Sequence, residues 1–195
     1  MNCMTDLEQS IVADTHVIAS GARLGHVNLR VTDLDRATDF YRDVLGLNVT
    51  CYGPAIGLPT VFLAFDDYHH HVALNWFYAD GSNSKSVGHG RLNHFGILYP
   101  DELSLAKAVE RLLQYGDLID DVRDHGGSLS VYLRDPDGNG IELYHDRPRS
   151  QWFDAMGHLI IKSEPVNVKK WLMETLTCET RASFSSMHRR FLEWL

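Results

Sequence analysis

Residues 26–46 read HVNLRVTDLDRATDFYRDVLG, and residues 94–116 read HFGILYPDELSLAKAVERLLQYG. Each stretch begins with a histidine and a short β-rich apolar run, continues with acidic residues suited to the start of a helix, and ends in a glycine. Apolar residues then recur at helical spacing, and the first of them, Ala37 or Leu105, follows the opening histidine by eleven positions in both copies. The chain therefore contains one strand–helix unit twice, and this internal repeat decides the fold.

Three β-rich runs follow the predicted helix in each copy. They read LNVTCYG, TVFLAF and HHVALNWF in the first copy, and LIDDVRD, SLSVYLR and GIELYHD in the second. The last hairpin of the second copy turns through DPDGNG from Asp135, whereas the first copy turns near Asp66. Aligning these two aspartates places Ala73 opposite Glu142, so only the second copy offers a carboxylate at that position.

The repeat predicts an α+β fold in which two βαβββ modules pair about a pseudo-twofold axis. We expect one domain over residues 1–195, with module one at about 22–80, module two at about 90–147 and a C-terminal extension at 148–195. Weak helical patterns at 168–176 and 186–195 predict a helical tail within the extension.

The composition favours a globular protein that acts on a small molecule. Apolar residues make up 44% of the chain and charged residues 23%, which are ordinary values for a folded domain. The formal net charge of -8 argues against a nucleic-acid partner. No run approaches the roughly 20 apolar residues of a membrane span, and no secretory signal order occurs, so we expect a cytoplasmic protein without a membrane partner.

A metal centre is predicted from His26, His94 and Glu142. The two histidines occupy equivalent positions of the repeat, so a pseudo-twofold pairing of the modules would bring them together. Glu142 lies between two apolar residues on a short strand, where a buried carboxylate is costly unless it is paired or binds a metal. Two imidazoles and one carboxylate suit divalent iron and leave positions for substrate and oxygen. Strand alternation equally permits Glu142 to face solvent, and the symmetry of the two histidines is what favours the metal centre.

Other polar residues near these strands have a functional and an ordinary interpretation. The run His69-His70-His71 opens the last strand of module one, and an inward-facing imidazole there could take up and return a proton, whereas a solvated loop is the ordinary alternative. His125 lies in a DHGG segment that reads as a surface turn before a strand. Tyr132 lies on a strand, where a core position is common.

The motifs carry a family resemblance from roughly Ile18 to Trp152. They read LGHVNLRVTDLDRATDFYRDVLGL, DYHHHVALNWF, LNHFGIL and DHGGSLSVYLRDPDGNGIELYHDRP, followed by Gln151-Trp152. The chain is similar to the vicinal oxygen chelate (glyoxalase/extradiol dioxygenase) superfamily and, within it, resembles the type I extradiol catechol 2,3-dioxygenases. This resemblance implies that the two modules form an incomplete eight-stranded barrel around a metal centre.

The resemblance implies a non-haem Fe(II) enzyme of aromatic catabolism that opens a catechol-type ring beside its hydroxyls and incorporates both atoms of O2. It implies iron ligands at His26, His94 and Glu142, a donor set that also accepts Mn(II). It places the acid/base histidine at His70, although strand alternation with Ala73 favours His71. It implies that His125 contacts substrate and oxygen, and that Tyr132 lies behind the glutamate, ten residues before it.

Two alternatives remain open at the level of sequence. A glyoxalase-like isomerase or thiol transferase would use a fourth protein ligand on the last strand of module one, where Ala73 stands; Asn75 is a displaced substitute. A non-catalytic module that binds an aromatic ligand would need no metal triad.

The C-terminal tail contains a predicted helix that could contact a neighbouring subunit. Met187, Phe191, Leu192 and Leu195 form one apolar face of a predicted helix, which would cover a neighbouring subunit, the mouth of the site or the tail's own domain. We expect a homo-oligomer.

Overall fold

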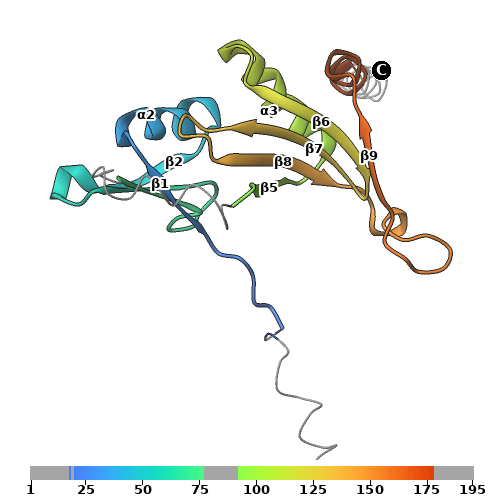
Figure 1. Cartoon of the computed structure of the whole chain (residues 1–195), viewed down its shortest axis with the longest axis horizontal. Helices are drawn as coiled ribbons and strands as arrows, with labels where there is room; N and C mark the ends of the chain where they lie inside the picture. The colour runs from blue at the N-terminus through green and yellow to red at the C-terminus, as the bar shows by residue number, and fades with distance from the viewer. Residues whose placement is uncertain (1–17, 19, 77–91, 178–195) are drawn as a thin grey trace, which may run out of the picture.

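The computed structural model describes residues 18, 20–76 and 92–177. Module one forms a four-stranded sheet with a short helical segment beside it (Figure 1). Its elements are β1 (Val27–Val31), α2 (Leu34–Asp39), a π-helical turn η1 (Phe40–Val44), β2 (Asn48–Tyr52), a 3-10 turn η2 (Gly53–Ile56), β3 (Thr60–Ala64) and β4 (Val72–Trp76). The strands lie in the order β1-β4-β3-β2, with β1 parallel to β4.

Module two repeats this arrangement and adds one strand. Its elements are β5 (Phe95–Tyr99), α3 (Glu102–Leu112), η3 (Leu113–Tyr115), β6 (Ile119–Gly126), β7 (Ser128–Arg134), β8 (Gly140–Asp146), η4 (Arg149–Gln151) and β9 (Ile161–Pro165). The order is β5-β8-β7-β6-β9, so the first four strands follow the same path as those of module one. The predicted α+β fold with two βαβββ modules is confirmed.

The helices begin where the acidic residues predicted. Asp33 and Asp101 are the N-caps of α2 and α3, and their side chains accept hydrogen bonds from the backbone N–H groups of Arg36 at 3.0 Å and Ser104 at 2.7 Å. Gly46 follows η1 with φ +84°, a left-handed conformation that favours glycine. The repeat therefore fixes both ends of each helical segment through local hydrogen bonds and backbone geometry.

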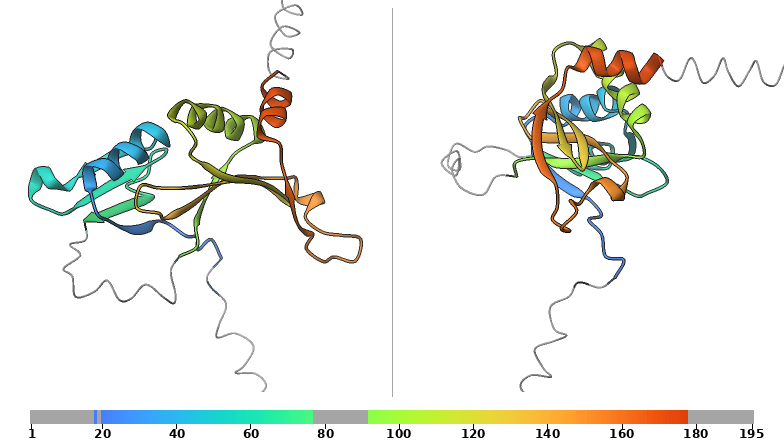
Figure 2. Two further views of the ribbon diagram at one scale, coloured as in Figure 1. Left: turned by 45° about the horizontal axis from the view of Figure 1, so that its top comes forward. Right: turned by 90° about the vertical axis from the view of Figure 1, so that its right-hand side faces the viewer.

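One face of each sheet packs against the helices, which lie on the same side of both sheets (Figure 2). Alternate strand residues such as Leu29, Leu74 and Leu143 are buried there and meet apolar residues of the helices, including Leu105 and Leu112, in one hydrophobic cluster. Of the candidate site residues, His125, Tyr132 and Glu142 lie on the opposite faces of β6, β7 and β8, whereas His26, His70 and His94 lie just before strands.

The two sheets lie side by side, and the strands do not close into one barrel within the described parts of the chain (Figure 1). The β8 hairpin and the module-one helix hold them in this arrangement. The buried Tyr41 hydroxyl donates to Asp135 Oδ2 at 3.0 Å, and Thr32 donates from its backbone N–H and its hydroxyl to Asp137 Oδ1 at 3.0 and 2.6 Å. The incomplete barrel predicted from the sequence thus takes the form of two sheets, of four and five strands, that do not close.

The extension contains a strand that the sequence pattern did not predict. β9 reads IKSEP, a short segment without apolar alternation, and it pairs with the edge of β6 through its backbone. Residues 168–177 are helical, as predicted for 168–176. Trp171 and Leu172 of this helix are buried, and Trp171 Nε1 donates to Glu102 Oε1 at 2.7 Å, so this part of the extension packs on its own domain.

The predicted helical segment 186–195 lies outside the described residues. Within the part of the chain that the structure covers, no helix combines the length and apolar character needed to cross a membrane.

Candidate metal centre

Three neighbouring strands bring the candidate ligands of module two together. β5 runs parallel to β8 with Gly96 opposite Glu142, and β7 runs antiparallel to β8 with Tyr132 opposite the same glutamate. His94 lies just before β5, and its Nε2 is 3.1 Å from Glu142 Oε2. An imidazole nitrogen and a carboxylate oxygen therefore lie within direct contact, as expected for two ligands of one cation.

Gly140 permits this close approach. A Cβ built at position 140 would lie 2.1 Å from the carbonyl oxygen of Asn93, the residue immediately before His94. A side chain of any size would push the start of β8 away from the start of β5. Glycine at position 140 is therefore a requirement for the contact between His94 and Glu142.

Tyr132 holds the second oxygen of the glutamate. The side chain of Glu142 is 16% exposed, and its Oε1 accepts a hydrogen bond from the Tyr132 hydroxyl at 3.0 Å. Burial, and then the hydrogen bond and charge of Glu142, raise the pKa of Tyr132 to about 12. Tyr132 is therefore a neutral donor at physiological pH, and it orients the carboxylate.

His125 continues the same chain of contacts. Its Nδ1 is 2.9 Å from the Lys162 carbonyl of β9, and its Nε2 is 2.9 Å from the Tyr132 hydroxyl. Because a carbonyl can only accept, Nδ1 carries a proton. The Tyr132 hydroxyl has a single proton. If it donates that proton to Glu142, it can only accept from His125, and Nε2 must then carry a proton as well. The direction of the hydrogen bond between Tyr132 and His125 therefore depends on whether the Tyr132 proton is donated to Glu142.

The sequence placed His125 in a surface turn, and the structure corrects this. His125 lies on β6, which extends to Gly126 and is covered on its outer edge by β9. The pairing with β9 half-buries the imidazole and supplies its carbonyl partner. Because β9 has no apolar pattern, nothing in the local sequence indicated this environment.

The remaining predicted residues gather in module one. The rings of His26 and His70 have centroids 4.6 Å apart, and His70 also stacks on Phe62 at 4.5 Å. The Nδ1 atoms of His69 and His70 are 2.7 Å apart. Burial, followed by the neighbouring His69 and His26, lowers the pKa of His70, which favours the neutral imidazole.

His70 and His71 have different ring contacts. β4 begins only at Val72, so the histidine run precedes the strand and strand alternation does not govern it. His71 stacks on Phe65 at 3.7 Å, and it lines a small cavity together with His26 and Phe95. Both His70 and His71 thus lie near His26, and the choice between them as the acid/base residue stays a prediction.

The strand register confirms the alignment of the two modules. In module one Ala73 lies opposite both Asn28 of β1 and Phe62 of β3. In module two Glu142 lies opposite both Gly96 of β5 and Tyr132 of β7. Ala73 of module one therefore corresponds to Glu142 of module two, and Phe62 corresponds to Tyr132.

The predicted triad is brought together only in part. His94 and Glu142 are in contact, whereas His26 lies with His70, and within residues 20–76 and 92–177 no group of three His, Cys, Asp or Glu side chains is placed to hold a metal ion. A cavity of about 100 Å3 lined by His26, Phe95 and Gly96, among others, lies where β1 approaches β5. The donor chemistry of the His94–Glu142 pair fits a divalent iron or manganese ion, and a third donor is needed to complete it.

A second group of residues, which the sequence pattern did not single out for a role, borders His125. A cavity of about 320 Å3 is lined by His125, Gly127, Ser128, Asp146, Trp152, Leu159, Ile160 and Ile161. Trp152 is fixed by a hydrogen bond from its Nε1 to the Arg147 carbonyl at 2.7 Å. Residues 159–161 belong to a part of the extension whose sequence shows no functional pattern. Only the structure, which places them beside His125, identifies them as lining residues of this cavity.

Known proteins share this fold and its motifs. A family model described as the Glyoxalase/Bleomycin resistance protein/Dioxygenase superfamily matches residues 23–143. The chain is 34% identical to a catechol-2,3-dioxygenase of Bacillus subtilis (strain 168) over 85% of this chain and 54% of the relative. It is 35% identical to biphenyl-2,3-diol 1,2-dioxygenase 3 of Rhodococcus globerulus over 64% of this chain and 63% of the relative. The chain therefore spans only about half to two thirds of these dioxygenases.

A solved structure supports the same relationship. The lactoylglutathione lyase from Agrobacterium tumefaciens is 28% identical, with a TM-score of 0.50 over 65% of this chain and 96% of that chain. Both dioxygenases and a lyase are thus among the similar proteins, and the family match covers most of both modules. This chain belongs to the Glyoxalase/Bleomycin resistance protein/Dioxygenase superfamily.

Proposed function

We propose that this protein is an Fe(II)-dependent extradiol dioxygenase that opens a catechol-type ring with O2 and incorporates both oxygen atoms. The observation that carries the proposal is Ala73, which lies at the counterpart of Glu142 in the strand register. An apolar residue there leaves at most three protein ligands, His26, His94 and Glu142, and therefore room for a substrate that binds through two neighbouring oxygens.

The same position argues against the isomerase and thiol transferase alternative, which uses a fourth protein ligand on this strand. Asn75 would be the nearest substitute, but its amide donates to Asn28 Oδ1 at 2.7 Å and is engaged within module one. The similarity to two dioxygenases at 34% and 35% identity supports the same choice.

Each residue has an expected role. His94 and Glu142 would hold Fe(II), or Mn(II), together with His26. When bound, the metal would act as the Lewis acid and redox centre that the reaction with oxygen requires. Tyr132 keeps Glu142 in one orientation through its hydrogen bond. The cavity beside His125, with Trp152 in its wall, would take the apolar part of the ring.

Two histidines are suited to move protons. We expect neutral His70, stacked on Phe62, to accept a phenolic proton and return it to the product. His125 has its Nδ1 proton fixed by the Lys162 carbonyl, which leaves Nε2 as the atom that exchanges a proton. The hydroxyl of Tyr132 lies between this Nε2 and the glutamate.

We further propose that His26 reaches the centre from a second copy of the chain. The contacts of Tyr41 with Asp135 and of Thr32 with Asp137 hold the two sheets of one chain side by side, with His26 against His70. A symmetric pair of chains would set the open face of module one of each copy against module two of the other. Under this proposal, the expected homo-oligomer is needed to complete the metal site. A cytoplasmic location stays a prediction.

Anaerobic reconstitution with Fe(II) tests the proposal. We expect about one iron per chain, oxygen uptake on adding catechol or an alkylcatechol, and a coloured ring-opened product in the near-ultraviolet to visible spectrum. Glu142→Ala should lose both iron and oxygen uptake, whereas Glu110→Ala, at an exposed position of α3, should keep both.

Each contrary result points to one alternative. Bound metal without catechol-dependent oxygen uptake would replace the dioxygenase with a metal-dependent isomerase or transferase. Absence of metal binding, with an aromatic compound still bound, would favour the non-catalytic binding module.

A further inference from the structure

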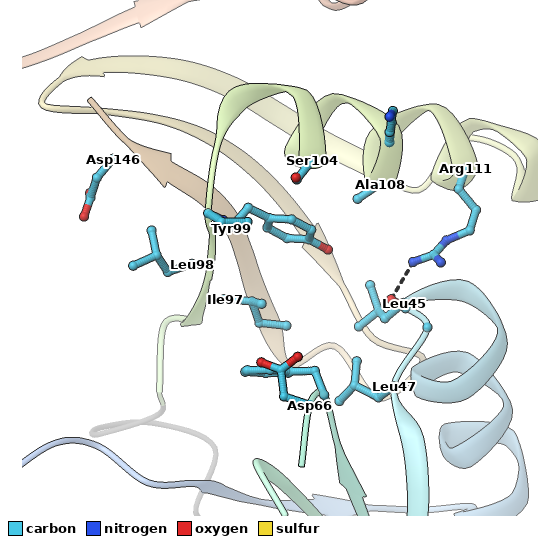
Figure 3. Close-up of a pocket in the computed structure, with 14 residues that line it drawn as sticks. Leu45, Leu47, Asp66, Ile97, Leu98, Tyr99, Ser104, Ala108, Arg111 and Asp146 are labelled. Atoms are coloured by element: carbon cyan, nitrogen blue, oxygen red, sulfur yellow. Dashed lines mark hydrogen bonds between the residues drawn. The ribbon is translucent and has the colours of Figure 1, made fainter. Parts of the chain in front are cut away.

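A large cavity lies between the two modules, on the helix side of the sheets. Its volume is about 730 Å3, within the range of roughly 300–1,000 Å3 that is typical of small-molecule sites. Its wall includes Leu45, Leu47, Ile97, Tyr99, Ala108 and Arg111 (Figure 3). On β5, Ile97 and Tyr99 point to the face opposite that of Gly96, the residue paired with Glu142. The cavity therefore lies mainly on the face of β5 opposite to the candidate metal centre. It shares Phe65 and Ile97 with the small cavity beside His26, and Asp146 with the cavity beside His125.

Arg111 supplies a fixed cation to this cavity. Its Nη2 donates to the Leu45 carbonyl at 2.5 Å, and its guanidinium lies against Gly46, where a Cβ would be 2.7 Å from Nη1. These contacts hold the plane of the group in place. Its Nε is buried and has no hydrogen-bond partner among the described residues. An oriented guanidinium in the wall of a cavity suits a planar carboxylate.

Tyr99 supplies a second donor at the same end. Its ring extends across the cavity with the hydroxyl toward Arg111 and Leu45 (Figure 3). Burial raises the pKa of Tyr99, and the nearby charge of Arg111 partly opposes this rise. The hydroxyl is therefore neutral at physiological pH and can donate to an anion beside the guanidinium.

The rest of the wall restricts the ligand further. Leu45, Leu47, Ile97 and Ala108 offer apolar surface next to the polar end. Asp66 and Asp146 bring carboxylates to other parts of the wall (Figure 3), and Lys107 adds a second cation. The two carboxylates balance the two cations in number, so a ligand with one anionic group on an apolar body fits this wall better than one with several negative charges.

We propose that this cavity is a second ligand site, which binds a small monocarboxylate with an aromatic or aliphatic body. The carboxylate pairs with the guanidinium of Arg111 and accepts from the Tyr99 hydroxyl, while the body packs on Ile97, Leu47 and Ala108. The site requires no metal, so it stands or falls independently of the proposed dioxygenase activity.

A titration of metal-free protein tests the site. We use 3-phenylpropanoate as the probe and 3-phenylpropanamide as its uncharged match, and follow backbone amides by ¹H–¹⁵N NMR. The carboxylate should cause saturable shifts at residues 45–47, 97–99 and 104–111, and the amide should bind about 10-fold or more weakly. Saturation without preference for the carboxylate, shifts confined to residues near Glu142, or no saturation at all would each overturn the proposal.

Variants separate the donors from the fold. Tyr99→Phe keeps the ring and the Arg111–Leu45 contact, and it should weaken the carboxylate several-fold while leaving the amide unchanged. Arg111→Met should abolish the preference for the carboxylate; if that chain does not fold, Tyr99→Phe decides. Two control variants should bind the carboxylate as the unmodified protein does. They are Arg134→Met, at an exposed arginine outside the cavity, and Glu142→Ala. Unchanged binding in both Tyr99→Phe and folded Arg111→Met would rule the site out.

Discussion

At the scale of single residues, the hydroxyl of Tyr132 connects the carboxylate and the imidazole of the candidate centre. It donates to Glu142 Oε1 at 3.0 Å and lies 2.9 Å from His125 Nε2. Removing it leaves the carboxylate held only on its Oε2 side, by His94, and removes the link to His125. We expect Tyr132→Phe to weaken Fe(II) binding or catechol turnover about 10- to 100-fold, as is usual when a residue that orients a metal ligand is lost.

The measurement is an iron titration followed by oxygen uptake at saturating iron. Tyr115→Phe is a matched control, because Tyr115 donates to the Asp43 carbonyl on the exposed surface. If Tyr132→Phe bound iron and consumed oxygen with catechol as the control does, Tyr132 would be only a packing residue.

At the scale of the elements, the contact between the starts of β5 and β8 sets the distance between His94 and Glu142. Gly140→Ala places a methyl group where only 2.1 Å separates the Cβ position from the Asn93 carbonyl. We expect a loss of about 1–3 kcal/mol in the free energy of unfolding, together with weaker metal binding.

Urea unfolding and the iron titration check this result. Gly127→Ala is the control, since its Cβ would meet Trp152 at an ordinary 3.6 Å. Equal stability and iron affinity in the two variants would mean that β5 and β8 tolerate a wider separation than the geometry implies.

Asp124 joins β6 to β9 and to the segment after β8. Burial opposes its ionisation, but the Gly126 N–H, Arg147 and Lys162 outweigh that effect and lower the pKa of Asp124. A carboxyl whose pKa is lowered by folding stabilises the fold above its unfolded pKa of about 3.9, and this contribution is lost as the pH falls through the folded value.

We therefore expect Asp124→Asn to cost about 1 kcal/mol of unfolding free energy at pH 7. This difference from the unmodified chain should shrink as the pH falls below about 4. Unfolding curves in urea at pH 7, 5 and 3 measure it. A difference that stayed constant over this range would mean that the charge of Asp124 does not contribute.

At the scale of the whole molecule, one hydrophobic cluster includes residues of both modules, together with Trp171 and Leu172 of the extension. This shared core supports the proposal that the chain folds as one domain. The open faces of the sheets, by contrast, carry His26 in one module and Glu142 in the other, and only a second copy would unite them under the proposed assembly.

Mixing two inactive variants tests that assembly. His26→Ala and Glu142→Ala chains should each be inactive, and unfolding and refolding them together in equal amounts should restore about a quarter of the sites in a twofold dimer. Half of the dimers are mixed, and each mixed dimer has one site with all ligands intact. Mass in solution should correspond to a dimer. Folded, dimeric mixtures that recover no activity would place all three ligands in one chain.

The repeat, the helix caps and the turn residues are local properties, and they suffice for the modules. The eleven-residue offset from His26 to Ala37 and from His94 to Leu105 predicted both strand–helix units, because apolar spacing records which face of an element is buried. The alignment of Ala73 with Glu142 followed from the two hairpin turns, and the strand register confirms it.

The sequence by itself therefore determined the two βαβββ modules and their caps, and it named His94 and Glu142 as members of one candidate site. Only the tertiary structure decided that the ring of His70 lies against His26, that β9 covers His125, and that the sheets stand side by side. The physical reason is distance along the chain. These features depend on contacts such as Tyr41 with Asp135 and Thr32 with Asp137, which join residues 94 and 105 positions apart and leave no periodic pattern in either segment.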